Sequence, residues 1–235
     1  MSDSDSEDER RDPLGHLMQR QDSIVPSQPP SIIPGEEVHL SYSAGALTVS
    51  IDLALDASPG CGGIAWPAGE VLSRYLVLRG PEFVKAKNVL ELGSGTGLCG
   101  LVAAAMGGKV VITDQAPLLP IMRDNIELNR LSAACKVVEL NWGEPIPEDI
   151  PTPDIVLAAD CVYIESAFPL LVQTLSDLVA NGDTQVLFCY KKRRKADKRF
   201  FALLKKQFRW VDVEDDPGRS TYTREAISLL RLYKI

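Results

Sequence analysis

The chain has 235 residues and a formal net charge of -7, with 45% apolar and 24% charged residues. This composition is typical of a globular protein with one large core, and it excludes collagen-like, low-complexity and wholly disordered chains. No apolar run approaches the roughly 20 residues of a membrane-spanning helix, and the acidic N-terminus does not resemble a secretory signal. We therefore expect a cytoplasmic protein, with the nucleus as the alternative, and no membrane partner.

The negative charge is concentrated at the N-terminus. Residues 1–12 contribute -4 of the -7, which leaves only -3 for the rest of the chain. A nearly neutral body argues against a nucleic-acid partner bound through the phosphate backbone. The five cysteines form no C-x-x-C pair, and both histidines, His16 and His39, lie in the first fifth of the chain. We expect reduced, mostly buried cysteines, no metal ion and no histidine-based catalytic triad.

Three regions follow one another along the chain. Residues 1–35 are acidic and rich in proline without any periodicity, which predicts a disordered tail. Residues 38–42 and 47–53 alternate apolar and polar around Ala44-Gly45, which predicts a β-hairpin within an N-terminal extension of residues 36–65. Pro67 can occupy the first turn of a helix over about 67–79, which opens a main domain of residues 66–235.

From Asn88 onward, short apolar runs alternate with amphipathic stretches. Strands are expected at 88–92, 109–113, 135–140, 153–159 and 184–190, and helices at 98–107, 117–130, 165–180 and 195–207. The last two runs, 210–213 and 226–233, are predicted to pair as an antiparallel edge hairpin with no room for a helix between them. Strands that are apolar on both faces and joined by helices indicate a parallel sheet covered on both sides. The predicted fold is therefore α/β, a doubly wound, seven-stranded, mostly parallel sheet with helices on both faces.

The sharpest motif is the run V-L-E-L-G-S-G-T-G at 89–97, in which a strand leads into a glycine turn and then a helix. Glycine lets the backbone take positive φ and approach a ligand closely. The spacing is neither G-x-G-x-x-G nor a P-loop. Asp114 ends the next strand, where a carboxylate can bind both hydroxyls of a ribose. Together these features indicate the nucleoside-binding half of a doubly wound sheet; the alternative is a tight turn with a helix-capping aspartate and no ligand.

Two further motifs extend this pattern, Asn141-Trp142-Gly143 and Asp160-Cys161-Val162-Tyr163. With the glycine loop and Asp114, they resemble the motifs of the seven-strand S-adenosylmethionine-dependent methyltransferases. Within that class the chain is similar to the family-16 protein-lysine methyltransferases of the methyltransferase-like-21 group, whose fungal members modify elongation factor 1-alpha. The similarity covers about residues 60–190. It implies S-adenosyl-L-methionine as cofactor and a lysine of a folded protein, such as elongation factor 1-alpha, as the methyl acceptor.

Carried onto this sequence, the resemblance implies roles for residues from five segments. The methionine part of the cofactor would lie against Glu91, Gly93 and the loop backbone. Asp114 would hold the ribose, Trp142 the adenine face, and Trp66 would help to close the pocket. The implied cofactor-binding residues are Trp66, Glu91, Gly93, Ser94, Gly95, Thr96, Gly97, Asp114, Gln115, Asn141, Trp142 and Ala159. Judged as single residues, each tryptophan is more often part of the core than a ligand contact.

Asp160 and Tyr163 are the catalytic candidates. Asp160 follows a buried strand at the edge where open α/β sheets bind ligands, although it could merely cap the next helix. A lysine amine with a pKa of about 10.4 must lose a proton before it attacks a methyl group. A carboxylate can orient the neutral amine by accepting its hydrogens, and Tyr163 would form an aromatic wall or offer a hydroxyl.

A basic run, residues 191–195, follows the strand at 184–190. A solvated loop is the simplest interpretation, and docking of an acidic substrate patch, an RNA or nuclear import are the alternatives. Other acceptors, namely a small amine, a protein N-terminus or RNA, also stay open, as does a noncatalytic cofactor-binding partner protein. We expect a monomer.

Overall fold

The computed structural model describes residues 36–56, 61–179 and 183–235. The tail predicted for residues 1–35 lies outside them. The predicted N-terminal hairpin is present: β1 (Glu36–Ala44) pairs antiparallel with β2 (Leu47–Leu55), and Gly45 takes a φ of +60° in the turn. Alternate residues of β2, from Val49 to Leu55, are buried, because a strand presents every second side chain to the same face.

Seven further strands form one sheet in the order β5-β4-β3-β6-β7-β9-β8. The first five are parallel, and β9 is antiparallel to both β7 and β8. Their bounds are β3 Asn88–Leu92, β4 Lys109–Asp114, β5 Cys135–Glu139, β6 Ile155–Ala159, β7 Gln185–Lys191, β8 Phe208–Asp212 and β9 Ile227–Lys234. The predicted fold class is thus confirmed.

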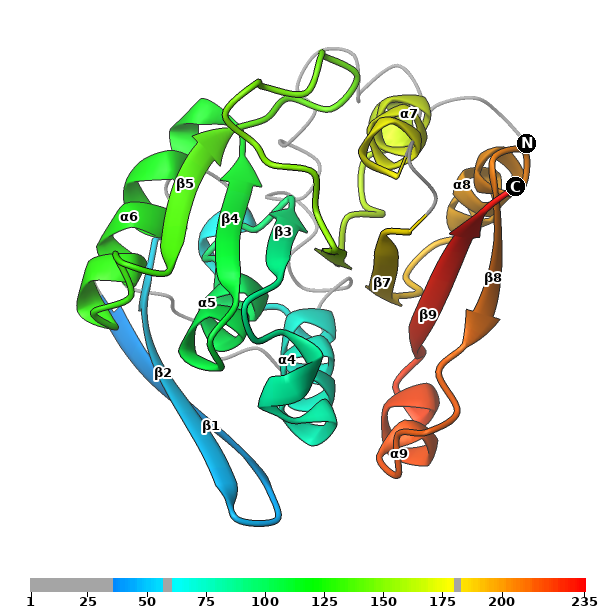
Figure 1. Cartoon of the computed structure of the whole chain (residues 1–235). Coiled ribbons are helices and arrows are strands. Elements are labelled where there is room, and N and C mark those ends of the chain that lie inside the picture. Colours follow the sequence, from blue (N-terminus) through cyan, green and yellow to red (C-terminus); the bar gives the residue numbers. More distant parts are fainter. Residues whose placement is uncertain (1–35, 57–60, 180–182) are drawn as a thin grey trace.

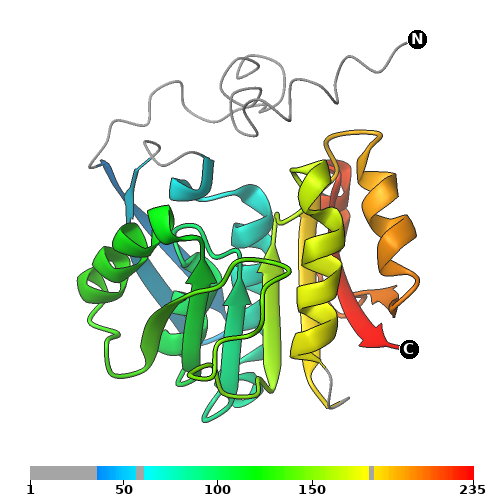
Figure 2. The ribbon, with the colours of Figure 1, turned by 90° about the horizontal axis from the view of Figure 1, so that it is seen from above.

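Helices cover both faces of this sheet (Figure 1). On one face α4 (Pro67–Arg79), α5 (Leu98–Ala105) and α6 (Leu119–Leu128) share a core with the hairpin. On the other face α7 (Phe168–Leu178) and α8 (Asp197–Leu204) build a second core. Seen from above, α7 lies in front of the strands and the hairpin behind them (Figure 2). None of the helices in the described ranges could span a bilayer.

Short 3-10 turns account for most differences from the predicted helix bounds. They span Cys61–Gly63, Pro81–Phe83, Ala116–Leu118 and Glu165–Ala167. The turns at 116–118 and 165–167 occupy what was predicted as the first turns of α6 and α7. A proline stands in the first turn of each helix, Pro120 in α6 and Pro169 in α7, where its missing N–H costs nothing.

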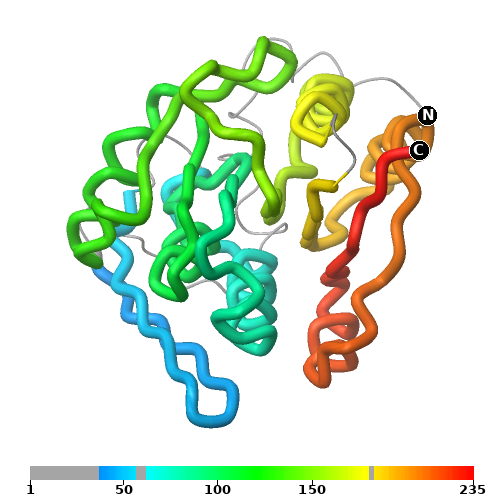
Figure 3. The backbone as a smooth tube through the Cα atoms, viewed as in Figure 1, coloured from blue at the N-terminus to red at the C-terminus, as the bar shows by residue number. Residues whose placement is uncertain are grey.

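The prediction that no helix separates the last two strands is wrong. A short helix, α9 (Arg219–Arg224), lies between β8 and β9. In Figure 3 the tube descends along β8, turns through α9 at the lower end and returns along β9. Only one residue of α9, Tyr222, is buried, so the helix shows no apolar periodicity in the sequence.

Two side-chain amides, Asn125 in α6 and Asn129 directly after it, join the hairpin to the main domain. Asn125 Oδ1 accepts the Ala54 N–H at 2.7 Å, and Asn129 Oδ1 accepts the Asp52 N–H at 2.9 Å. Their Nδ2 groups donate back to the carbonyls of the same two residues, at 3.2 and 2.6 Å. The two asparagines are four residues apart, and their partners are two residues apart on β2, so the side chains and the backbone groups lie opposite each other. The amides thereby continue the hydrogen-bond pattern of β2.

Candidate active site

The glycine loop connects β3 to α5 at the carboxyl edge of the parallel strands. Gly93, Gly95 and Gly97 all have positive φ, of 63°, 57° and 85°. A Cβ on Gly93 would lie 2.9 Å from Cζ2 of Trp142, and one on Gly95 only 2.4 Å from the carbonyl oxygen of Gly62. The loop therefore needs glycine for its backbone conformation and for the close approach of its neighbours.

The remaining loop side chains hold the turn in place. Ser94 and Thr96 are buried, so they brace the loop from within. Ser94 Oγ donates to the Glu91 carbonyl at 3.0 Å, and Thr113 Oγ1 donates to the same oxygen at 2.7 Å. The Asn125 side chain donates to the Thr96 carbonyl at 3.0 Å. The sequence did not point to Thr113 or Asn125; the only signal was a polar residue on an apolar face of its element.

Glu91 supports the loop from below. Its carboxylate is buried and accepts the N–H groups of Gly100 at 2.9 Å and Cys99 at 3.3 Å in the first turn of α5. Burial raises the pKa of Glu91 to about 7, and these N–H donors moderate the rise. Both carboxylate oxygens of Glu91 bind α5. The methionine part of the cofactor would therefore contact the glycine loop, which Glu91 supports from below.

Asp114 ends β4 next to the loop. Its Oδ2 accepts the Gly95 N–H at 2.8 Å and its Oδ1 the Gln115 N–H at 2.7 Å. Burial raises the pKa of Asp114, while these two backbone donors lower it. A carboxylate offers about four acceptor positions, so two remain for the two hydroxyls of a ribose. Gln115 is exposed beside it.

The tryptophan motif flanks the loop on its other side. Trp142 is half-buried, and its ring edge faces Gly93. The Gly143 N–H donates to Thr174 Oγ1 at 2.8 Å, which ties the motif to α7. Asn141 instead donates to the surface acids Glu139 and Glu144, each at 3.2 Å. The segment thus meets the cofactor loop through Trp142, while the Asn141 side chain is held by its neighbours.

Asp160 follows Ala159, the half-buried last residue of β6. It takes a φ of +56°, and its N–H donates to the Cys189 carbonyl at 2.8 Å. Its carboxylate receives both ends of the Arg193 guanidinium, each at 2.8 Å, and Oδ1 also accepts the Lys191 N–H at 2.9 Å. The two side chains are only 5% and 13% exposed. Three of about four acceptor positions are occupied, and the remaining one is on Oδ2.

The arginines of the basic run are part of this site. Arg193 lies over the ring of Trp66, 4.9 Å from its centroid, and so joins Asp160 to the N-terminus of α4. Arg194 donates to the carbonyl of Tyr163. The buried Asp197 accepts the backbone N–H groups of both arginines, at 3.0 and 3.2 Å. The interpretation as a solvated loop is therefore wrong for Arg193, and Asp197 is a supporting residue that the sequence analysis missed.

Cys161 packs against the end of β3 and the start of the glycine loop. Its Sγ donates to the Leu92 carbonyl at 3.2 Å and would lie 3.1 Å from a Cβ on Gly93. The four cysteines with described side chains, Cys99, Cys135, Cys161 and Cys189, are free and buried, as predicted. The side chain of Cys61 lies outside the described residues. Burial raises the pKa of the Cys161 thiol, which suits a packing role.

A glycine loop, an acid at the end of the next strand and a flanking tryptophan at the carboxyl edge of this sheet are the arrangement expected of a class I, S-adenosylmethionine-dependent methyltransferase. A methyltransferase of bacterial 16S ribosomal RNA from T. thermophilus, in complex with S-adenosylmethionine and guanosine, shares this fold. Its TM-score is 0.59 and its sequence identity 19%, over 87% of this chain and 52% of that one.

The family follows from sequence similarity. Residues 48–207 match the lysine methyltransferase family, and the chain belongs to it. It is 36% identical to the protein-lysine N-methyltransferase EFM6 of Saccharomyces cerevisiae over 86% of this chain and 95% of that protein. It is 39% identical to the protein N-lysine methyltransferase METTL21A of Danio rerio, over 72% and 78%. It is 32% identical to the EEF1A lysine methyltransferase 3 of Mus musculus, over 76% and 80%. The resemblance stated from the motifs is thus confirmed.

Proposed function

We propose that this enzyme methylates a lysine of elongation factor 1-alpha, and that it acts as a cytoplasmic monomer. The observation that carries the site assignment is the Asp160 carboxylate, fixed beside the cofactor loop with one acceptor position left on Oδ2. The substrate assignment is supported by the similarity to a mouse enzyme named for methylation of this factor. The near-neutral body of the chain supports a protein partner rather than a nucleic acid.

The residues around Asp160 can prepare an amine for transfer. When bound, S-adenosyl-L-methionine supplies an activated methyl group. The Arg193 guanidinium balances the negative charge of the Asp160 carboxylate, so the pair does not hold an incoming amine in its ammonium form, and the amine can release its proton to solvent. Oδ2 of Asp160 then accepts one hydrogen of the neutral amine and orients its lone pair. Tyr163, half-buried three residues further on, would form a wall of the acceptor site.

The experiment is transfer of labelled methyl from S-adenosyl-L-methionine to purified elongation factor 1-alpha, followed by mass spectrometry of the labelled residue. Asp160→Asn keeps the shape and one acceptor oxygen but removes the charge. We expect at least a tenfold loss of kcat with cofactor affinity within twofold of the wild type. Asp177→Asn, which removes an exposed acid from α7, is the matched control and should behave like the wild type.

Four results would overturn the proposal. Label that enters only small molecules or RNA would refute a protein acceptor, and label on a protein N-terminus would refute lysine. Lysine label in another protein of a lysate, with none in elongation factor 1-alpha, would refute the substrate. Full transfer by Asp160→Asn would refute the orienting role of Asp160.

A further inference from the structure

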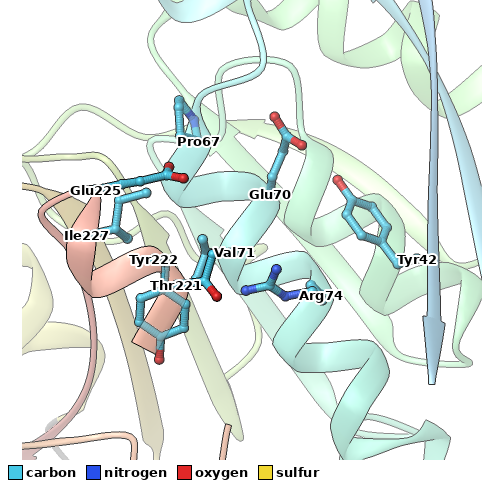
Figure 4. A pocket seen from close by; sticks show the side chains of 9 residues that line it. All are labelled: Tyr42, Pro67, Glu70, Val71, Arg74, Thr221, Tyr222, Glu225 and Ile227. Atoms are coloured by element: carbon cyan, nitrogen blue, oxygen red, sulfur yellow. The ribbon is translucent and has the colours of Figure 1, made fainter. Parts of the chain in front are cut away.

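A groove crosses the outer side of α4, between the hairpin and α9 (Figure 4). Its volume is about 290 Å³. The buried side chains Val71, Tyr222 and Ile227 line it, and the charged side chains Glu70, Arg74 and Glu225 are exposed around it. An apolar floor with a charged rim suits a long side chain that carries a charge at its end. We refer to this cavity as the α4–α9 groove.

The groove begins at the candidate active site. Glu70 lies one helical turn after Trp66, whose carbonyl accepts the Glu70 N–H at 3.2 Å. On the other side, Ile227 pairs with Lys191 in the sheet, and the Lys191 N–H binds Asp160. A protein segment that brought a lysine to Asp160 would therefore have its neighbouring residues at the groove.

Arg74 is the cation that lines the groove beside its two carboxylates. Neither Glu70 nor Glu225 makes an ion pair with another residue that the structure describes. Burial raises the pKa of Glu70, and Glu225 raises it further, while Arg74 lowers it. Arg74 itself lies beside the ring of Tyr222, 6.0 Å from its centroid. A further cation close to Glu70 would stabilise its ionised form.

Tyr42 points to the same ligand independently of the two acids. Tyr42 is 8% exposed. Its hydroxyl makes no hydrogen bond of normal geometry with a described residue, although the nearby Ser73 side chain interacts with it and lowers its pKa. Figure 4 shows this hydroxyl directed towards Glu70. Burial raises the pKa of Tyr42, so the hydroxyl stays protonated. A buried hydroxyl without a partner costs about 1–3 kcal/mol, and a bound ligand with N–H donors would remove that cost.

We propose that the α4–α9 groove binds a lysine or arginine side chain of the protein substrate, close in space to the lysine that is methylated. The apolar floor contacts the methylene stem, and Glu70, Glu225 and the Tyr42 oxygen accept hydrogen bonds from the cationic head. This inference rests on the proposed function, because the occupant belongs to the protein substrate. It adds a second recognition site, which selects among lysines by a neighbouring positive charge.

Steady-state kinetics of the full-length enzyme with its protein substrate test the groove. The double variant Glu70→Gln/Glu225→Gln should raise KM for the protein about tenfold, as expected for two partly exposed charge-assisted contacts. The kcat value and KM for S-adenosyl-L-methionine should stay within twofold. Glu82→Gln/Glu127→Gln, which removes two exposed acids elsewhere, is the matched control and should leave all three constants unchanged.

A substrate variant separates recognition from a general charge effect. In the substrate, the basic residue nearest to the methylated lysine is replaced by glutamine. This change should raise the KM of the wild-type enzyme for the protein about tenfold, and should raise the KM of the double variant little further. Equal KM values for the double variant and its control would overturn the inference and leave the proposed function standing. If the wild type methylated no protein at all, the proposed function and this inference would both be overturned.

Discussion

Replacement of Arg193 by methionine should destabilise the protein and lower its activity through Asp160. The guanidinium makes two hydrogen bonds of 2.8 Å to a carboxylate that is 5% exposed. Without it, that carboxylate keeps only the Lys191 N–H as a partner among the described residues. Removing one member of a buried ion pair costs about 3–5 kcal/mol, so we expect a loss of about 3 kcal/mol in the free energy of unfolding. Arg193→Lys restores the charge but not the two-pronged geometry, and should recover part of this loss.

A double-mutant cycle with Asp160→Asn and Arg193→Met, followed by urea unfolding, measures the coupling free energy between the two side chains. If the pair acts as described, Asp160→Asn/Arg193→Met should be more stable than the sum of the single changes predicts, by about 2 kcal/mol or more. The kcat value should fall at least tenfold in Arg193→Met, because the carboxylate loses its fixed orientation and Trp66 loses the cation above its ring. Additive effects of the two single changes, or unchanged kcat in Arg193→Met, would refute this reasoning.

Three further predictions concern the cofactor loop. Asp114→Asn should weaken binding of S-adenosyl-L-methionine about tenfold or more in calorimetry, because hydrogen bonds to a charged group contribute about 1.5–3 kcal/mol; Asp124→Asn on α6 is the control, and equal affinities would contradict the ribose assignment. The pKa of Glu91 lies near 7 in the folded protein against 4.5 for the free side chain. Between these values the folded state therefore binds more protons than the unfolded state, and the free energy of unfolding should fall by about 3 kcal/mol from pH 4.5 to 8. Glu91→Gln should lack that fall when the free energy of unfolding is measured by urea titration at each pH. The same dependence on pH in the wild type and the variant would show that Glu91 is not its source. Asn125→Ala should lower the melting temperature and cost about 3 kcal/mol, since it leaves backbone groups of the half-buried Ala54 and the buried Thr96 unpaired; a cost below 1 kcal/mol would contradict this bonding.

The sheet could be predicted from the sequence because its strands are apolar on both faces and their bounds are marked by polar residues. The observed bounds of β3, β4 and β7 lie within one residue of the predicted ones. The helix α9 could not be predicted in this way, because Tyr222 alone anchors it.

The site could be predicted only in part. Positions within one motif, such as the glycine loop, follow from local rules of backbone conformation. The partnership of Asp160 with Arg193 joins residues that are 33 positions apart, so spacing alone does not show it. The parallel pairing of β6 with β7 was the available signal, because it brings Asp160 beside the start of the basic run. The contact between Arg193 and Trp66 depends on side-chain packing, for which the sequence holds no comparable pattern.

The side-chain amides of Asn125 and Asn129 have a consequence for how the chain unfolds. An outer β-strand is usually open to pairing with another chain, but the backbone groups of Asp52 and Ala54 are already bonded to Asn129 and Asn125. The outer edge of β2 is thus shielded from pairing with another molecule. Because Asn125 also holds the Thr96 carbonyl, detachment of the hairpin would release the turn that receives the cofactor. The first strands of the chain and the cofactor loop therefore belong to a single cooperative unit, and cofactor binding should slow amide exchange as far away as β2.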